Sequence, residues 1–555
     1  MKRLLLIFHL CCLALLVGAQ NGYFYQPAEG WCGDPMPFYD AVSGEFRIYY
    51  LQEYRPNDWA TYHPVHMIST TDFVNYGESG VVLPSGNQWA QDAAIGTGSV
   101  IKAHTGTYYF YYTGNKYQPS ESECRQVIMC ATSTDGINWT KTSFRLAPDT
   151  WYYYHDDFRD PEVFRTEDGV YHMLIATGKD GRNVLAHFTS SDCYNWTHKG
   201  VFMTTLWDRF YECPHVFKMG NYWYLVYSEL HREIRRVQYF KATTFAGLAA
   251  CTANDNPVWP DDHEGYLDSR GFYAGKTASD GTNRYIWGWC PTRRDNNNTA
   301  VNNDNGEPDW AGTLVAHRLI QHADGSLTLG EIEPVRIWFN DDVEVSTTSA
   351  SLVAGGSLAL PSLSEKTHLS FTVTASSAQT KFGVSVAKES WSNRYYSIII
   401  NPEANNRAKV NFEQEGPDAM GFIPYIDGYF FSQPTDRVYH IDIYIDRSVF
   451  VLYINNQVCY TNRIYGLQNK PWTIRCYNGS VQITDIRQQI NDPSQPTDPD
   501  PDPTQDMTSS VPETHAAGKY LRNGILVIRR DGAEYTQLGQ RLVWQNSTAT
   551  NIINY

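Results

Sequence analysis

The chain alternates between short apolar runs and clusters of Gly, Asp and Asn. Four of these runs, rich in aromatic and β-branched residues, lie at residues 46–50, 108–112, 171–175 and 222–226. Such residues favour strands, and the Gly, Asp and Asn that bound them favour turns. Long stretches with the periodicity of a helix are hard to find once the first apolar segment has ended. The pattern therefore predicts an all-β fold.

A weak internal repeat accompanies these runs. In three places an aromatic residue follows an aspartate by four positions: Asp72 and Tyr76, Asp135 and Trp139, Asp192 and Trp196. The copies recur at intervals of about 60 residues, which is typical of a repeated strand–turn–strand unit such as a propeller blade. Residues 22–338 have room for five such units, so we expect a five-bladed β-propeller there. A common turn motif that occurs three times by chance is the alternative.

Past Trp338 the pattern changes to alternating strands, for example at residues 368–373 and 440–445. Alternation of apolar and polar residues predicts strands with one buried face, which is typical of a β-sandwich. No turn with catalytic residues stands out in this part of the chain. We therefore expect a second domain, a β-sandwich, over residues 341–490.

The two ends of the chain differ from these domains. Lys2 and Arg3 precede an apolar run that ends in small residues, which predicts a signal peptide over residues 1–19 and export of the chain. Residues 491–506 are rich in Pro and Asp, which is typical of an extended linker, and a tail follows at 507–555. No later segment reaches transmembrane length, so no membrane anchor is expected.

Composition narrows the class of partner. The formal net charge of −16 argues against nucleic acid and anionic membranes. Aromatic residues make up 14% of the chain. This content suits carbohydrate binding, because sugar rings stack on aromatic planes, although aromatic residues also fill the cores of β-proteins.

Signals for metals are weak. The cysteines beyond the apolar N-terminal run are odd in number and lack metal-site spacing, so we expect mostly free, buried thiols. His63 and His66 fit a turn or a substrate rim better than a metal site. The Asn/Asp-rich residues 295–305 fit a solvated loop better than a calcium site. No metal and no cofactor are expected.

Three carboxylates stand beside prolines in strand-like, aromatic surroundings. They are Asp34 before Pro35, Asp160 before Pro161, and Glu212 in Glu212-Cys213-Pro214. Each alone could be an ordinary turn. In a propeller, however, the first residues of the innermost strands converge at one end of the central channel. Glycoside hydrolysis needs one carboxyl group to protonate the leaving oxygen and one to attack or to activate water, and a third can stabilise the charged sugar ring. The set therefore predicts a glycosidase.

The residues that flank the acids are specific. The segments Trp31-Cys32-Gly33-Asp34-Pro35, Phe158-Arg159-Asp160-Pro161 and Tyr211-Glu212-Cys213-Pro214 resemble, in this order, the motifs of glycoside hydrolase family 32, the β-fructosidases. Arg159 and Cys213 favour this family over the inverting arabinosidases and xylosidases of family 43, whose three acids lack them. Similarity at Gln52, His66, Ser99 and Trp310, and again in the expected sandwich, extends the resemblance over residues 22–490.

The resemblance implies a role for each acid. Asp34 would be the nucleophile, Glu212 the general acid/base and Asp160 the transition-state stabiliser of a retaining mechanism. The substrate-binding residues would be Arg159, which also holds Asp160, together with Gln52, His66, Ser99, Cys213 and Trp310. Trp89 is a candidate for a substrate-stacking rim, with core packing as the alternative. The substrate would be a fructan or a sucrose-like oligosaccharide; linkage, endo or exo action and oligomeric state stay open.

One departure concerns the nucleophile segment. The family usually has Asn-Asp-Pro-Asn-Gly, whereas this chain has Gly33-Asp34-Pro35-Met36-Pro37. The first Asn normally helps to bind the terminal sugar, so the identity of the sugar does not follow from the acids. An inverting furanosidase and a carbohydrate-binding protein that has lost its chemistry are therefore alternatives. Residues 519–524 in the tail resemble the sorting segments of secreted Bacteroidetes proteins, which implies secretion or delivery to the cell surface.

Overall fold

The computed structural model describes most of the chain. The described residues are 20–21, 23–54, 63–120, 122–149, 152–205, 210–231, 234–251, 266–293, 308–386, 395–415, 429–465, 469–494 and five strands between 518 and 553. The expected signal peptide, the loop at 295–305 and most of the expected linker lie outside the described residues. The chain divides into two units, the first ending at Asp498 and the second beginning at Pro499.

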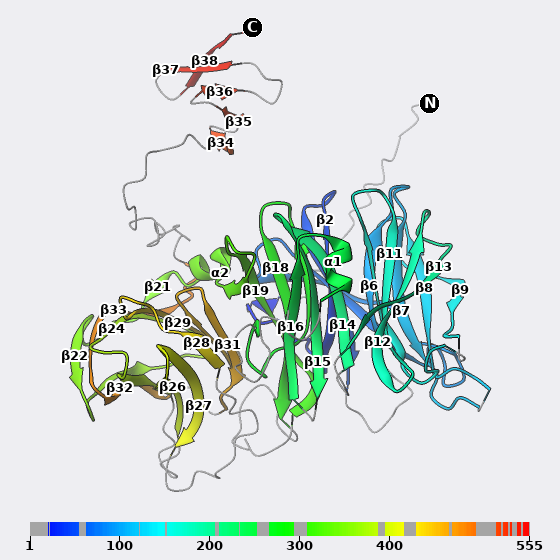
Figure 1. Cartoon of the computed structure of the whole chain (residues 1–555). Helices are drawn as coiled ribbons and strands as arrows, with labels where there is room; N and C mark the ends of the chain where they lie inside the picture. The colour runs from blue at the N-terminus through cyan, green and yellow to red at the C-terminus, as the bar shows by residue number, and fades with distance from the viewer. Residues whose placement is uncertain are drawn as a thin grey trace, which may run out of the picture. The chain divides into compact units, whose positions relative to one another are not determined.

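The N-terminal part of the first unit consists of antiparallel sheets in which consecutive strands are neighbours (Figure 1). The first sheet contains β1 (Gln20–Asn21), β2 (Trp31–Asp40), β3 (Glu45–Glu53), β4 (Val65–Thr70) and β5 (Asn75–Leu83). The second contains β6 (Ala94–Lys102), β7 (Tyr108–Asn115), β8 (Gln126–Ser133) and β9 (Thr140–Leu146). The third contains β10 (Phe158–Arg165), β11 (Tyr171–Lys179), β12 (Arg182–Ser190) and β13 (Thr197–Thr204). Next come β14 (Phe210–Met219), β15 (Tyr222–His231) and β16 (Ile234–Ala242), and then β17 (Tyr273–Ser279), β18 (Arg284–Arg293), β19 (Pro308–Gln321) and β20 (Leu327–Gly330).

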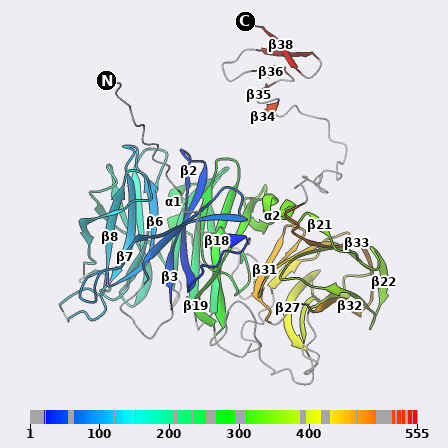
Figure 2. The same cartoon turned by 180° about the vertical axis from the view of Figure 1, so that it is seen from behind.

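The first strands of the five groups of strands contact one another in a closed ring. β2 contacts β6, β6 contacts β10, β10 contacts β14, β14 contacts β17, and β17 returns to β2. A backbone pair between Gly312 and Cys32 also joins β19 to β2. Sheets that follow one another around an axis make a β-propeller, and Figure 2 shows the same sheets from behind. The expected all-β propeller is therefore confirmed; within the described residues, helix is limited to the short α1 (Phe245–Ala249) and α2 (Glu333–Trp338).

The repeat found in the sequence is a turn between the last two strands of each of the first three sheets, namely between β4 and β5, β8 and β9, and β12 and β13. Oδ1 of Asp135 accepts the N–H groups of Ile137 and Asn138, each at 2.8 Å, and Oδ2 accepts Nδ2 of Asn138 at 2.8 Å. Asp72 and Asp192 make the same set of bonds to their following residues. The aspartate thus replaces backbone partners in each turn, and the aromatic residue that follows packs onto the sheet.

The C-terminal part of the first unit contains two further antiparallel sheets. One consists of β21 (Asp341–Asp342), β22 (Ala350–Val353), β24 (Lys366–Ala375), β29 (Val438–Asp446), β30 (Val449–Ile454), β31 (Val458–Arg463) and β33 (Ser480–Ile490). The other consists of β23 (Ser357–Ser362), β25 (Lys381–Val386), β26 (Tyr395–Glu403), β27 (Arg407–Glu415), β28 (Tyr429–Ser432) and β32 (Pro471–Asn478). Side chains of both sheets, such as Ile443 and Trp472, share one hydrophobic core, as expected for strands with one buried face.

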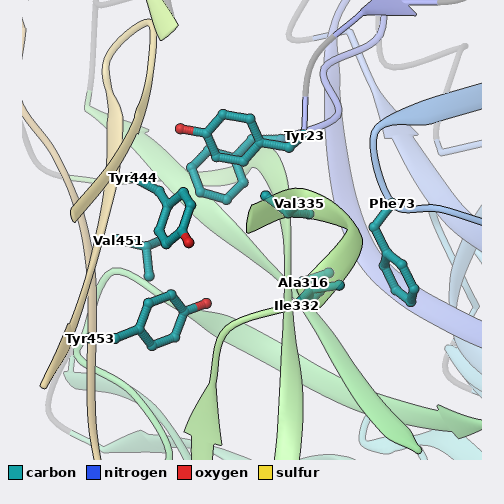
Figure 3. Close-up of a pocket in the computed structure, with 9 residues that line it drawn as sticks. Tyr23, Phe73, Ala316, Ile332, Val335, Tyr444, Val451 and Tyr453 are labelled. Atoms are coloured by element: carbon teal, nitrogen blue, oxygen red, sulfur yellow. The ribbon is translucent and has the colours of Figure 1, made fainter. Parts of the chain in front are cut away.

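The propeller and these two sheets meet across buried contacts. The buried Arg463 of β31 donates from Nε to the carbonyl oxygen of Pro291 at 2.7 Å and from Nη2 to that of Cys290 at 2.9 Å. Figure 3 shows a small pocket nearby, where Tyr444 and Tyr453 lie opposite Val335. Its volume of about 20 Å³ is that of roughly one water molecule, so this pocket is far too small for a sugar.

The described residues of the second unit form five antiparallel strands, which make one sheet in sequence order. They are β34 (Gly518–Arg522), β35 (Ile525–Arg530), β36 (Ala533–Tyr535), β37 (Arg541–Gln545) and β38 (Thr548–Ile553). Among the described residues of the whole chain, no helix is long and apolar enough to cross a membrane. The cysteines from Cys32 to Cys476 are free, and most are buried, as the sequence predicts.

Candidate active site

The first strand of every propeller sheet carries a β-bulge near its start. The register shifts between Gly33 and Met36, Gly96 and Gly98, Arg159 and Glu162, Glu212 and His215, and Tyr273 and Lys276. Inside these bulges Asp34, Asp160, Cys213 and Ala274 have positive φ angles of 22°, 59°, 48° and 57°. Such angles cost a non-glycine residue roughly 1–2 kcal/mol. Asp34 and Asp160 thus occupy corresponding positions on β2 and β10, whereas Cys213 takes this position on β14 and Glu212 precedes it by one residue. A bulge re-aims the side chains around it, so all three acids are presented at the same end of their strands.

Asp34 is buried, and two donors hold its carboxylate. Thr97 Oγ1 of β6 donates to Oδ2 at 2.5 Å, and Trp289 Nε1 of β18 donates to Oδ1 at 2.9 Å. Burial raises the pKa of Asp34, and these two hydrogen bonds oppose that rise because they stabilise the ionised form. The carboxylate is therefore fixed in orientation by residues from two other strands.

Cys213 connects the acids to one another. Its N–H donates to Oδ2 of Asp160 at 2.9 Å, and its Sγ donates to Thr97 Oγ1 at 3.8 Å. Thr97 in turn donates to Asp34, and Glu212 is the residue before Cys213. The side chain of Cys213 is buried. This residue, expected from the sequence to bind substrate, thus contacts the groups that hold the acids.

Glu212 is more open than the other two acids, with 18% of its side chain exposed. Its Oε1 accepts a hydrogen bond from Arg159 Nη2 at 2.9 Å, and its Oε2 accepts one from the hydroxyl of Tyr273. Arg159, expected from the sequence to hold Asp160, thus bonds to Glu212 and Asp157 and acts on Asp160 only through its charge. The guanidinium of Arg159 also lies over the ring of Phe210, 4.0 Å from the ring centroid. A carboxyl group that must exchange protons with a leaving group and with water needs such partial access.

Burial raises the pKa of Asp160 to about 7. The positive charge of Arg159 opposes this rise, whereas the charges of Glu212 and Asp34 add to it. The folded-state pKa thus lies above the unfolded value of about 4. Asp160 therefore adds to the free energy of unfolding. This contribution is fully present below about pH 4 and is lost as the pH rises through about 7.

Replacement of Asp160 with Asn should therefore stabilise the protein at high pH. We expect Asp160→Asn to raise the melting temperature at pH 8 and to change it much less at pH 4.5, because Asn keeps an acceptor for the Cys213 N–H without a buried charge. Differential scanning calorimetry at the two pH values measures this. An equal shift at both pH values would contradict the assignment of the effect to ionisation.

A second polar layer lies next to the acids along the same strands. Lys276 Nζ lies 3.1 Å from Oε2 of the buried Glu162 and donates to the carbonyl oxygen of Gly98 at 2.8 Å. His215 Nδ1 lies 2.8 Å from Oε1 of Glu162. These contacts join β6, β10, β14 and β17 beside a cavity of about 280 Å³, which residues of all five first strands line. The layer thus ties together the strands that carry the acids.

The other residues expected to bind substrate differ in their surroundings. Trp310 lies beside Asp34, because its ring occupies the space next to Gly33. Ser99 Oγ donates to the carbonyl oxygen of Pro161 at 2.8 Å and accepts the N–H of Val163 at 2.9 Å, so it joins β6 to β10. Both residues are thus close to the acids, but the hydroxyl of Ser99 is engaged in holding strands together.

Gln52, His66 and Trp89 are less directly connected to the acids. Gln52 is buried, its Nε2 donates to the carbonyl oxygen of Glu29 at 2.6 Å, and its Oε1 has no partner among the described residues. His66 lies on β4, 3.4 Å from the hydroxyl of Tyr54, and burial lowers its pKa to about 4. Trp89 is 71% exposed in the connection between β5 and β6. None of the hydrogen bonds found for these three described side chains reaches an acid.

Several residues of the site were not found from the sequence. Thr97, Trp289 and Tyr273 donate to the carboxylates, and Thr113 Oγ1 accepts the N–H of Asp160 at 2.9 Å. Thr97 lies two residues before Ser99, whose similarity to family 32 was a usable signal. The others lie on β7, β17 and β18 without any local pattern, since only the closure of the propeller brings them to the acids.

One cluster of possible metal ligands is present among the described residues, away from the acids. Asp268, His317 and Cys459 bring one ligand atom each to within 4.8 Å of one another. Cys459 Sγ lies 3.6 Å from Nδ1 and 3.9 Å from Nε2 of His317, so it is not aligned with either nitrogen. Asp268 already accepts hydrogen bonds from the N–H and the hydroxyl of Thr461. The geometry is that of a hydrogen-bonded network between the propeller and β31.

Comparison with known proteins shows the family of this chain. The family model for the glycosyl hydrolases family 32 N-terminal domain matches residues 24–330, and the model for the GH32, BT1760-like, C-terminal domain matches residues 327–488. The chain is 23% identical over 339 residues to sucrose-6-phosphate hydrolase of Escherichia coli, covering 57% of this chain and 66% of that protein. It is 27% identical over 214 residues to raffinose invertase of Escherichia coli, covering 37% of this chain and 43% of that protein. These matches span less than two thirds of either relative.

Solved structures share the fold over a longer range. Fructan 1-exohydrolase IIa from Cichorium intybus has a TM-score of 0.68 at 17% identity, covering 84% of this chain and 96% of that chain. The Bombyx mori GH32 β-fructofuranosidase has a TM-score of 0.62 at 16% identity, covering 84% of this chain and 93% of that chain. At such identity the likeness shows the fold alone. Because the N-terminal family model matches more than half of the residues, this chain belongs to glycoside hydrolase family 32.

Proposed function

We propose that the protein is a retaining glycoside hydrolase that cleaves β-fructofuranosidic bonds in fructans or sucrose-like oligosaccharides. Asp34 attacks the anomeric carbon, Glu212 protonates the leaving oxygen and then activates water, and Asp160 stabilises the positive charge on the fructosyl ring. Arg159 holds Glu212 through Nη2, 2.9 Å from Oε1, and contacts the hydroxyl groups of the bound sugar. No metal or cofactor takes part in these steps.

One observation carries the proposal. The three acids lie at the bulges of β2, β10 and β14. The charge of Glu212 raises the pKa of Asp34, and the charges of Glu212 and Asp34 both raise the pKa of Asp160. A structural carboxylate gains nothing from a like charge nearby, because mutual repulsion raises its pKa and costs stability. Active sites accept this cost, since a nucleophile and an acid/base must both reach one sugar.

The known relatives indicate the substrate class. Relatives that are similar in sequence include sucrose-6-phosphate hydrolases, a raffinose invertase and fructan 1-exohydrolases. One solved relative is described as a complex of fructan 1-exohydrolase IIa with 1-kestose. These names share the cleavage of a bond to fructose. A β-fructoside is therefore the proposed substrate, with the linkage left to the experiment below.

We also propose the division of the chain that the sequence suggested. Residues 22–338 would be a propeller of five blades, because five first strands close the ring, and residues 341–490 would be the β-sandwich. Residues 1–19 would be a signal peptide, 491–506 a linker and 507–555 a sorting segment of an exported protein. A polysaccharide is a substrate that an exported hydrolase can reach.

A substrate screen tests the proposal. Purified protein is incubated with sucrose, inulin, levan, a nitrophenyl β-fructofuranoside and a nitrophenyl arabinofuranoside, and released sugar is measured. We expect fructose or fructo-oligosaccharides from at least one fructoside. Release from the arabinofuranoside alone would support the furanosidase alternative, and binding of fructans without any product would support a non-catalytic binding protein.

The stereochemistry of the first product separates the two enzymatic candidates. Proton NMR at early times follows the anomer that is released before mutarotation. Retention is expected when Asp34 forms a glycosyl-enzyme, because two inversions restore the configuration. Inversion in the first product would contradict the nucleophilic role of Asp34 while leaving a hydrolase in place.

A further inference from the structure

The cavity of about 280 Å³ lies inside the ring of first strands, on the side of the bulges away from the three acids. Its walls come from residues 36–39, 99–100, 162–164, 215–217 and 276–279, which end or follow the bulges, and from Arg284 of β18. Pockets for small molecules usually measure about 300–1,000 Å³, so this one suits a small ligand and not an oligosaccharide. The proposed hydrolysis takes place at the other end of the strands and gives this cavity no role.

The charged groups that line the cavity do not balance. Lys276 Nζ lies 3.1 Å from Oε2 of Glu162, so these two charges neutralise each other. Burial lowers the pKa of His215, and the charges of Lys276 and Arg284 outweigh the opposing effect of Glu162, so the ring is neutral at pH 7. One carboxylate thus faces two permanent cations, and the positive charge that remains is that of Arg284.

Hydrogen bonds connect Arg284 to the ion pair in one direction. A guanidinium can only donate, so Thr277 Oγ1 accepts from Arg284 Nη1 at 2.7 Å. The hydroxyl hydrogen of Thr277 is then directed to Nε2 of His215, 2.8 Å away. His215 Nδ1 therefore carries the ring hydrogen, and it lies 2.8 Å from Oε1 of Glu162. Thr277 and His215 have no hydrogen left for a ligand, so Arg284 is the donor that a ligand would meet.

Most N–H groups of Arg284 have no acceptor. The bond to Thr277 is the one hydrogen bond found for this side chain among the described residues, and none of their carboxylates pairs with it. The guanidinium lies over the ring of Phe217, 4.2 Å from the centroid, which orients its plane but satisfies no N–H group. Burial lowers the pKa of Arg284 to about 10. The side chain is nevertheless only half-buried, so a ligand can reach it.

We propose that this cavity binds a small oxyanion of the phosphate type, which Arg284 holds through its unused N–H groups. The guanidinium presents parallel N–H groups that match two oxygens of a phosphate, and the surplus positive charge favours an anion. Phe38, Phe164 and Phe217 provide an apolar wall that can accommodate a small organic group. Free phosphate and a sugar monophosphate share this chemistry. The site goes beyond the proposed hydrolysis and does not depend on it.

Calorimetric titration with inorganic phosphate, and separately with glucose 6-phosphate, tests the site. We expect binding at one site per chain, and the tighter of the two ligands identifies the source of the phosphate group. Arg284→Gln keeps a donor for Thr277 but removes the charge and the fork, so it should raise the Kd at least about 10-fold. Arg165→Gln is the matched control, because Arg165 also lies over an aromatic ring, that of Tyr171, but is exposed and outside the cavity. Absence of binding by the unchanged protein, or an unchanged Kd in Arg284→Gln, would overturn the proposal.

Two further variants locate the anion and guard against misfolding. Arg159→Gln removes the cation beside the acids and should leave the Kd for phosphate within about 3-fold; a loss there, with normal binding by Arg284→Gln, would place the anion at the acids and contradict the proposal. Arg284→Lys keeps the charge without the fork and should bind more weakly than the unchanged protein but more tightly than Arg284→Gln.

Thermal stability gives an independent readout. Phosphate at about 10 mM should raise the melting temperature of the unchanged protein and of Arg165→Gln above the value in chloride of equal ionic strength, because a ligand of the folded state stabilises it. Arg284→Gln should show no such difference. An equal rise in all three proteins would mean a general salt effect and would overturn the site. Because neither measurement needs turnover, a protein that releases no sugar from any fructoside would contradict the proposed function and leave this test intact.

Discussion

Replacement of Asp34 with Asn is expected to abolish turnover while leaving the fold and substrate binding in place. Asn has nearly the same shape, and its side-chain oxygen can accept from Trp289 Nε1 as Oδ1 of Asp34 does at 2.9 Å. The hydroxyl of Thr97 can rotate to accept from the amide instead of donating to a carboxylate. An amide, however, is no nucleophile, so kcat should fall by about 10⁴-fold or more.

The measurement is release of fructose from the best substrate of the screen, together with the melting temperature and the affinity for that substrate. Asp180→Asn is the matched control, because Asp180 also has a positive φ of 51° but is 87% exposed and lies outside the site. We expect this control to hydrolyse normally. Turnover by Asp34→Asn within about 10-fold of the control would rule out Asp34 as the nucleophile.

Replacement of Glu212 with Gln is expected to produce a loss that depends on the leaving group. The side-chain oxygen of Gln can still accept from Arg159 Nη2, and its NH2 group can donate to the Tyr273 hydroxyl, which then rotates to accept. Gln cannot, however, protonate the leaving oxygen. Loss of a general acid lowers the rate by about 10²–10⁴-fold for a poor leaving group such as a sugar alkoxide. A nitrophenyl fructoside needs no proton in the first step and should form the glycosyl-enzyme at a much less reduced rate.

The comparison is between sucrose or fructan and the nitrophenyl fructoside, each with and without azide as an external nucleophile. Azide replaces the water that Glu212 would activate, so it should accelerate turnover of the nitrophenyl substrate by Glu212→Gln. Glu167→Gln is the control, because Glu167 is 75% exposed and pairs with Lys218 at the surface. Equal losses on both substrates, without azide rescue, would be incompatible with an acid/base role.

Strand character and the location of the acids were accessible from the sequence because both depend on local information. Aromatic and β-branched runs between turn residues became the strands of the propeller sheets, and the Asp135 turn recurs with the same hydrogen bonds at Asp72 and Asp192. The segments around Asp34, Asp160 and Glu212 were recognisable because their neighbours are also constrained. Arg159 reaches Glu212, and the N–H of Cys213 holds Asp160.

The nucleophile segment shows which contacts could not be predicted from neighbouring residues. In the sequence, Gly33 and Met36 stand where the family usually has Asn, so only the loss of two amide side chains was evident. In the structure Gly33 makes room for the Trp310 ring, and the Met36 sulfur lies 3.1 Å from the N–H of Gly98 as its acceptor. Both residues therefore fit partners on β19 and β6. No pattern in the residues next to Gly33 or Met36 indicates these contacts.

By itself, the sequence determined which residues carry carboxylates, where strands and turns alternate, and which family motifs surround the acids. Only the tertiary structure decided what holds those acids: Thr97 and Trp289 on Asp34, Cys213 on Asp160, Arg159 and Tyr273 on Glu212. The reason is that strand propensity and turn chemistry act within a few residues. Hydrogen bonds and ring contacts around a closed ring of sheets join residues that are hundreds of positions apart, and their geometry exists only after the ring has closed.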